Sequence, residues 1–203
     1  ADVEKGALSL DEPIILHDRD KVGGAGVIAG WADGTAIPIS QLLRLMITES
    51  DNTATNLMID RLGMDAINEY MQAKGYKDSK LARKMMDTAA AAAGRENMTS
   101  VNDLGTYFTR LWRQEGMSDA SRTFMLDCLY GQTDTECFPQ AFPDAKIAHK
   151  TGELAGLYDD GGIIVRRNGP LVLVIVDDDI DSRGGTIHKM QKVAQRIGAV
   201  NPE

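Results

Sequence analysis

The pattern of apolar residues changes near residue 143, and this change constrains the fold more than any other feature. Before it, apolar residues recur at helical spacing in one segment after another. After it come three short β-rich segments, Lys146–Lys150, Gly162–Arg167 and Leu171–Asp177, with the hairpin signal Asn168-Gly169 between the last two. Helical spacing returns at Gly184–Ile197. The order predicts an α+β protein with a helical lobe, about residues 1–143, and an antiparallel sheet lobe with a C-terminal helix, about residues 144–203.

Five helices are predicted before the change, over residues 39–47, 53–62, 65–74, 101–114 and 119–129. Ser40 is the expected N-cap of the first, because a serine hydroxyl can accept from a free backbone N–H. Gly63 and Gly75 are the expected stops of the second and third. Residues 1–6 are typical of the last turn of a helix that ends at Gly6. Residues 18–34 form a glycine-rich connection.

Size and charge exclude several classes of function. A chain of 203 residues can form one domain with a substantial core or two small lobes with one interface. Its net charge of -8 argues against a nucleic-acid partner. The longest apolar run, Leu171–Val176, is too short to cross a membrane. The first residues do not have the pattern of a signal peptide, but this does not place the protein in the cytoplasm.

No metal or other cofactor is expected. Cys128 and Cys137 are nine positions apart and are either bridged or free, and neither has a histidine at metal-ligand spacing. The acidic run Asp177–Asp179 lacks the ligand spacing of a calcium loop and is typical of a solvated strand end.

The tripeptide Ser50-Asp51-Asn52 lies between two predicted helices. A serine hydroxyl in such a turn can pass a proton, and an asparagine amide can bind a substrate carbonyl. The same residue types are also the favoured helix N-caps, so the tripeptide alone is more typical of a capping turn.

A second tripeptide, Lys150-Thr151-Gly152, lies where the first predicted strand ends. The lysine supplies a positive charge and the threonine a hydroxyl, and both suit a substrate carboxylate. The glycine allows a ligand to approach the backbone. Taken alone, this motif is also compatible with an ordinary surface strand end.

With their flanks, the two motifs resemble the class A β-lactamases and other penicillin-recognising serine hydrolases. The resemblance covers residues 47–63 and 148–154 and extends to residues 4–12, 83–87 and 94–97. It implies a single β-lactamase-like catalytic domain over residues 1–203. The implied ligand is a β-lactam or a peptidoglycan stem peptide, and the implied location is outside the cytoplasmic membrane.

The resemblance also implies roles for individual residues. Ser50 corresponds to the hydroxyl that relays a proton to the leaving nitrogen. Asn52 corresponds to the amide that holds the substrate side chain. Lys150 and Thr151, followed by Gly152, correspond to the site for the substrate carboxylate. The backbone N–H of Glu153 corresponds to one oxyanion donor.

The nucleophile motif of this family, Ser-x-x-Lys, is absent. None of the eight serines has a lysine three positions later. The resemblance places the missing motif about three helical turns before Ala1. We therefore expect the chain to be a fragment that is inactive alone and that has its missing N-terminal segment as a partner. The alternative is a naturally short protein that only binds peptidoglycan or β-lactams.

The deacylating carboxylate of class A β-lactamases has no clear counterpart. The corresponding region is Arg83–Asn97, in which Asp87 is the nearest candidate. A structural Asp87 paired with Arg83 or Lys84 is the other interpretation. A penicillin-binding DD-peptidase-like enzyme with slow deacylation is therefore also consistent with the sequence.

Overall fold

The computed structural model describes residues 2–200, which divide between Asp103 and Leu104 into two compact units. The predicted lobe boundary near residue 143 and the single domain over residues 1–203 stay predictions. Among the described helices, none has the length and apolar character needed to cross a membrane.

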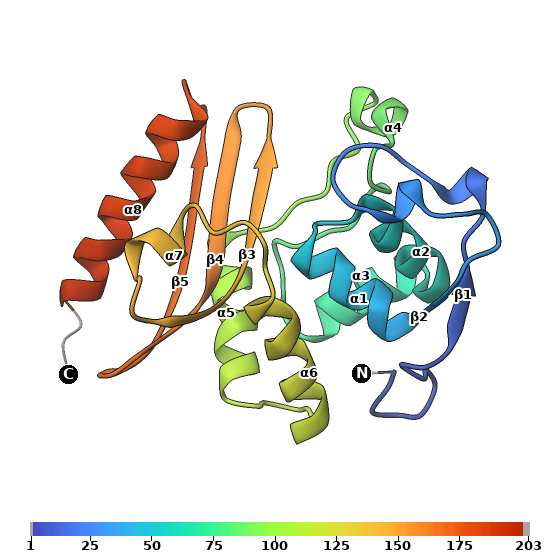
Figure 1. The fold of residues 1–203 in the computed structure, drawn as a ribbon, viewed down its shortest axis with the longest axis horizontal. Coiled ribbons are helices and arrows are strands. Elements are labelled where there is room, and N and C mark those ends of the chain that lie inside the picture. The colour runs from blue at the N-terminus through green and yellow to red at the C-terminus, as the bar shows by residue number, and fades with distance from the viewer. Residues whose placement is uncertain (1, 201–203) are drawn as a thin grey trace. The chain divides into compact units, whose positions relative to one another are not determined.

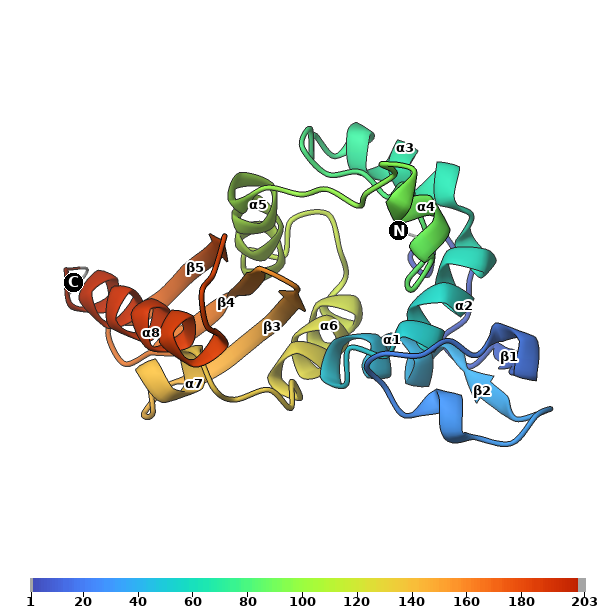
Figure 2. The same ribbon diagram turned by 90° about the horizontal axis from the view of Figure 1, so that it is seen from above.

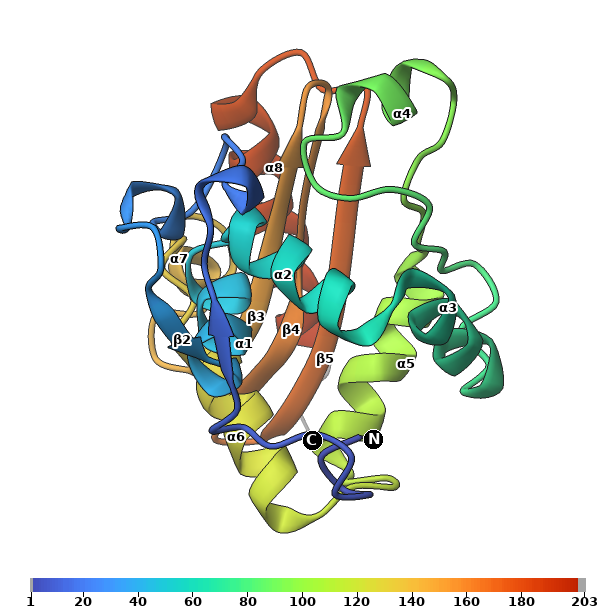
Figure 3. The same cartoon turned by 90° about the vertical axis from the view of Figure 1, so that its right-hand side faces the viewer.

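The first unit is mainly helical (Figure 1). A two-stranded antiparallel sheet of β1 (Pro13–Ile15) and β2 (Ala36–Pro38) precedes α1 (Ile39–Thr48), α2 (Asn52–Leu62), α3 (Met64–Ala73) and α4 (Thr88–Ala92). α1 packs against α2 (Figure 3). The core of the unit is one apolar cluster of buried residues, namely Leu8, Leu16, Ile28, Ile37, Ile39, Leu42, Ala54, Leu57 and Met58.

The predicted helix ends at glycine residues are confirmed. α2 ends at Leu62 before Gly63, and α3 ends at Ala73 shortly before Gly75. Near the start of the chain, Gly6 has φ 69° and donates to Val3 O at 3.0 Å, while Ala7 N donates to Asp2 O at 2.9 Å. This is the hydrogen-bond pattern of a glycine-terminated helix end, which confirms the predicted turn from Asp2 onward. Ala1 lies outside the described residues.

The predicted N-cap of α1 is wrong. Pro38 is the N-cap, and Ser40 lies inside the helix. The N–H groups of Ile39 and Ser40 donate to Glu12 O at 3.0 Å and to Leu10 O at 2.8 Å. Because neighbouring backbone already satisfies these first N–H groups, the helix needs no side-chain cap.

The second unit is a three-stranded antiparallel sheet with helices on both faces. β3 (Lys146–Leu154), β4 (Leu157–Arg166) and β5 (Gly169–Asp178) lie in that order. α7 (Phe138–Ala141) and α8 (Arg183–Val200) cover one face, and α5 (Val101–Trp112) lies on the other (Figure 2). α6 (Asp119–Tyr130) packs on β3. Cys137, Phe138, Tyr158, Ile164 and Met190 belong to the core of this unit. Cys128 and Cys137 are both buried and do not form a disulfide.

The strands are longer than predicted. The hairpin turn at Arg167-Asn168 is confirmed, since Arg166 pairs with Gly169. β3 extends to Leu154 and turns back through Ala155-Gly156, so Lys150–Gly152 lie within the strand and not at its end. The observed helical, then sheet, then helical order confirms the predicted α+β fold.

Candidate active site

Asp51 builds the turn at the Ser50–Asn52 motif. Its Oδ1 accepts from Ala54 N at 2.8 Å, so Asp51 is the N-cap of α2. Its Oδ2 accepts from Val27 N at 2.7 Å and from Ile28 N at 2.9 Å. The side chain is buried, and these three N–H donors satisfy it. The capping interpretation therefore holds for Asp51, while the half-buried Ser50 adopts a left-handed backbone with φ 51°.

The glycine-rich segment before α1 holds the motif from the other side. Asn52 N donates to Ala25 O at 3.1 Å, and Asn52 Nδ2 donates to Gly23 O at 3.1 Å. A Cβ at Gly24 would lie 2.5 Å from Asn52 Nδ2, and one at Gly26 would lie 2.4 Å from Asp51 Cγ. The glycines are therefore required for close approach to the motif. This segment was predicted only as a connection, although its density of glycines was the available signal.

Asp87 lies beside a cavity of about 250 Å³ in the first unit, which Asn56 and Met85 also line. Asn56 fixes the backbone of Met85 next to this cavity, because its Oδ1 accepts from Met85 N at 2.8 Å and its Nδ2 donates to Met85 O at 3.1 Å. Asp87 is the N-cap of α4 and accepts from Ala90 N at 2.9 Å.

The suggested pairing of Asp87 with Arg83 or Lys84 is wrong. Arg83 pairs with Glu96 at 2.7 Å, and Lys84 pairs with Asp60 at 2.5 Å. Asp87 is structural through its helix cap instead, because a carboxylate at the N-cap satisfies a free N–H of the first turn.

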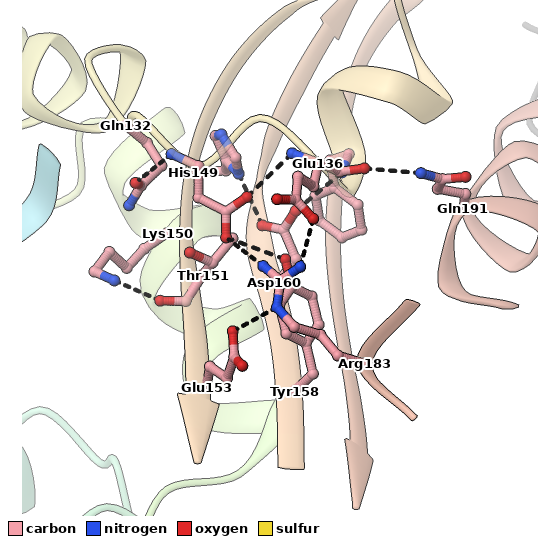
Figure 4. Close-up of polar contacts among 12 residues, drawn as sticks. Gln132, Glu136, His149, Lys150, Thr151, Glu153, Tyr158, Asp160, Arg183 and Gln191 are labelled. Carbon is pink, nitrogen blue, oxygen red and sulfur yellow. Dashed lines mark hydrogen bonds and ion pairs between the residues drawn. The ribbon is translucent and has the colours of Figure 1, made fainter. Parts of the chain in front are cut away.

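The Lys150–Gly152 motif faces three small or acidic positions of β4. Lys150 is opposite Gly161, Thr151 is opposite Asp160, and Gly152 is opposite Asp159. Because side chains alternate along a strand, Lys150 and Thr151 point to opposite faces of the sheet. Lys150 Nζ donates to the Thr151 carbonyl oxygen, as Figure 4 shows. Burial lowers the pKa of Lys150, and the nearby Asp159, Asp134 and Asp160 carboxylates oppose this effect.

A buried polar pair lies on the Thr151 face. His149 Nδ1 and Asp160 Oδ1 are 2.9 Å apart, and Asp160 Oδ2 accepts from Phe138 N at 3.0 Å. Both side chains are buried, on the face of the sheet opposite Lys150. Burial raises the pKa of Asp160, and the hydrogen bond with His149 opposes that rise. Asp160 was not predicted as the partner of His149.

Arg183 at the start of α8 joins three acidic side chains (Figure 4). Its Nε donates to Glu153 Oε2 at 2.8 Å, its Nη1 donates to Glu136 Oε2 at 2.5 Å, and its Nη2 lies 4.0 Å from Asp134 Oδ2. This bonding fixes the Glu153 side chain next to the backbone N–H proposed as an oxyanion donor. Arg183 was not predicted as part of the site, because its partners are distant in the chain.

Comparison with known proteins identifies the family. The model of the β-lactamase enzyme family matches residues 1–200. A solved β-lactamase from Sphaerobacter thermophilus is 30% identical with a TM-score of 0.92, and the match covers 98% of this chain and 77% of that one. The solved protein PBP-A is 26% identical with a TM-score of 0.87, over 98% of this chain and 74% of that one. The chain therefore belongs to the β-lactamase enzyme family, and the predicted resemblance and fold are confirmed.

Two further relatives are also β-lactamases. The extended-spectrum β-lactamase PER-1 of Pseudomonas aeruginosa is 26% identical over 95% of this chain and 68% of its own length. A β-lactamase of Streptomyces lavendulae is 26% identical over 77% of this chain and 53% of its own length. The chain thus spans between about half and two thirds of these two relatives.

Proposed function

We propose that this protein is a β-lactam hydrolase that uses an acyl-enzyme mechanism. The observation that carries the proposal is the family match over residues 1–200, within which Asn52 begins α2 and Lys150–Gly152 lie in β3. Lys150 and Thr151, on opposite faces of β3, bind the ligand carboxylate at the sheet edge that β3 forms, and the Asn52 amide binds its acyl side chain. Ser50 relays the proton to the leaving nitrogen, and the Glu153 N–H stabilises the oxyanion.

A serine nucleophile with a lysine one helical turn later is not among residues 1–203. We propose that these residues bind the acyl donor without being acylated and that the attacking serine comes from a polypeptide segment outside this sequence. The substrates of such an enzyme are found outside the cytoplasmic membrane, so we propose an extracytoplasmic location.

Slow deacylation by a penicillin-binding protein is the second candidate. This candidate is favoured because the exposed Asp87 carboxylate already serves as the N-cap of α4. A fixed cap is a weak general base, because its lone pairs already accept a backbone N–H. PBP-A, a mutant of which was solved as an acyl-enzyme complex with penicillin G, supports this candidate as a structural relative.

Binding of a fluorescent penicillin to the 203-residue chain tests the proposal. We expect reversible binding in fluorescence anisotropy and no covalent label on a denaturing gel. Lys150→Ala should weaken binding about 30-fold or more, since a charge-assisted hydrogen bond contributes roughly 2 kcal/mol.

Lys189→Ala is the matched control, because this exposed lysine of α8 pairs with Asp177 at 3.0 Å. It should bind as the unaltered protein does. Covalent labelling of the isolated chain would show that the nucleophile assignment is wrong. Equal affinity of the Lys150→Ala variant would remove Lys150 from the binding site.

A further inference from the structure

The Asp159 carboxylate lies directly over Gly152 of the second motif. The two residues are opposite each other in the β3–β4 register. A Cβ at Gly152 would lie 2.4 Å from Asp159 Oδ2 and 2.9 Å from its Cγ. The glycine therefore leaves room for an acidic side chain of the protein itself, in addition to any ligand.

Asp159 also shares a face of the sheet with Lys150. Lys150 is opposite Gly161, which has no side chain, and Asp159 is two positions from Gly161. The carboxylate is thus the diagonal cross-strand neighbour of the lysine, within reach of a long side chain. The Phe108 ring of α5 lies next to Gly161, 3.2 Å from where a Cβ would be, and gives this face an apolar wall.

Asp159 and Lys150 affect each other's pKa. Burial raises the pKa of Asp159 to about 6, and Lys150 acts against that rise. Burial lowers the pKa of Lys150, and Asp159 is the largest charge opposing it. A low-dielectric surrounding strengthens such a pair relative to the same pair in water.

The other acidic groups near Lys150 have their own partners. Asp160 pairs with His149 at 2.9 Å on the opposite face. Asp134, in the loop before α7, accepts from Tyr158 OH at 3.2 Å and lies near Arg183. Among these carboxylates, Asp159 is the one that shares the face of Lys150.

We propose that Asp159 is a specificity-determining residue that acts as an internal counterion of Lys150 and competes with the carboxylate of the ligand. This inference rests on the proposed function, in which Lys150 binds that carboxylate. An ionised Asp159 disfavours anionic acyl donors and leaves neutral ones unaffected, because only an anion is repelled. The pair therefore reduces the preference of the site for anionic over neutral acyl donors at neutral pH.

The competition has a defined pH dependence. Protonation of Asp159 removes the competing charge, so affinity for an anionic ligand rises as the pH falls through about 6. The ligand stays anionic in this range, since an ordinary α-carboxyl group has a pKa of roughly 3.5. Lys150 is the cation that faces Asp159 from β3, and Asp160 is its acidic neighbour on β4.

The test compares benzylpenicillin with its neutral methyl ester on the 203-residue chain and on Asp159→Asn, by calorimetry at about pH 7.5 and about pH 5, on either side of the Asp159 pKa. We expect Asp159→Asn to bind benzylpenicillin about 10-fold more tightly at the higher pH and to bind the ester unchanged. The unaltered protein should gain affinity for benzylpenicillin at the lower pH, while Asp159→Asn should not. Asp178→Asn removes the same charge from an exposed position at the end of β5 and should change nothing.

A second measurement needs no ligand. NMR titration should show a higher pKa for Asp159 in Lys150→Gln, because the lysine that lowers it is gone. An unchanged Asp159 pKa overturns the proposal. Equal affinity of both proteins for benzylpenicillin also overturns it, while leaving the proposed function intact. Binding of neither ligand by either protein contradicts the proposed function and the inference together.

Discussion

Asp51→Ala is expected to lower the free energy of unfolding by about 4 kcal/mol. The substitution leaves the N–H groups of Val27, Ile28 and Ala54 without their shared acceptor. The bonds from Ile28 and Ala54 are buried, and each unpaired buried donor costs roughly 1–3 kcal/mol. Because Asp51 joins the glycine-rich segment to α2, the loss should also reduce hydrogen-exchange protection at Val27 and Ile28. Urea denaturation followed by circular dichroism measures the main effect.

Asp87→Ala is the matched control for this prediction. It also removes an aspartate N-cap, but the side chain is exposed and accepts a single N–H, that of Ala90. Its cost should be about 1 kcal/mol. Similar losses for the two variants would mean that the bonds from Asp51 to the glycine-rich segment add nothing to stability.

Asp160→Ala is expected to cost about 3–5 kcal/mol, the range for removing one partner of a buried pair. It leaves the buried His149 ring nitrogen and the Phe138 N–H without an acceptor under α7. Thermal and urea unfolding of the variant measure the loss. In this variant, the segment that joins α7 to β3 is expected to unfold first.

Asp177→Ala supplies the comparison, because Asp177 pairs with the exposed Lys189 on the surface. Such a pair contributes about 0–1 kcal/mol. A loss below about 1 kcal/mol for Asp160→Ala would show that the His149–Asp160 pair is no more stabilising than this surface pair.

The helices around the first motif were predictable because their ends are set by local chemistry. Gly63 ends α2, and a residue of the Ser50–Asn52 motif is its N-cap, as the capping interpretation required. The N-cap of α1 was not predictable, since backbone carbonyl groups at Leu10 and Glu12, far from Ser40 in sequence, accept from its first N–H groups. A local pattern carries no information about such a partner.

The sheet was predicted in outline, but its strands were predicted too short. Adjacent aspartates are unusual in a strand, so the start of β4 at Leu157 was missed. Asp159 lies there over Gly152, and Asp160 pairs with His149. Tertiary pairing overrides intrinsic preference here, and Lys150 was predicted as a site residue without the acidic neighbours that oppose the lowering of its pKa.

The proposed function requires that the two motifs bind one acyl donor. Its most direct test is an NMR titration of the chain with benzylpenicillin, observing the backbone amides of Asn52 and Thr151. We predict that both signals shift and that both follow one dissociation constant. Shifts at only one motif, or two different dissociation constants, would contradict the account.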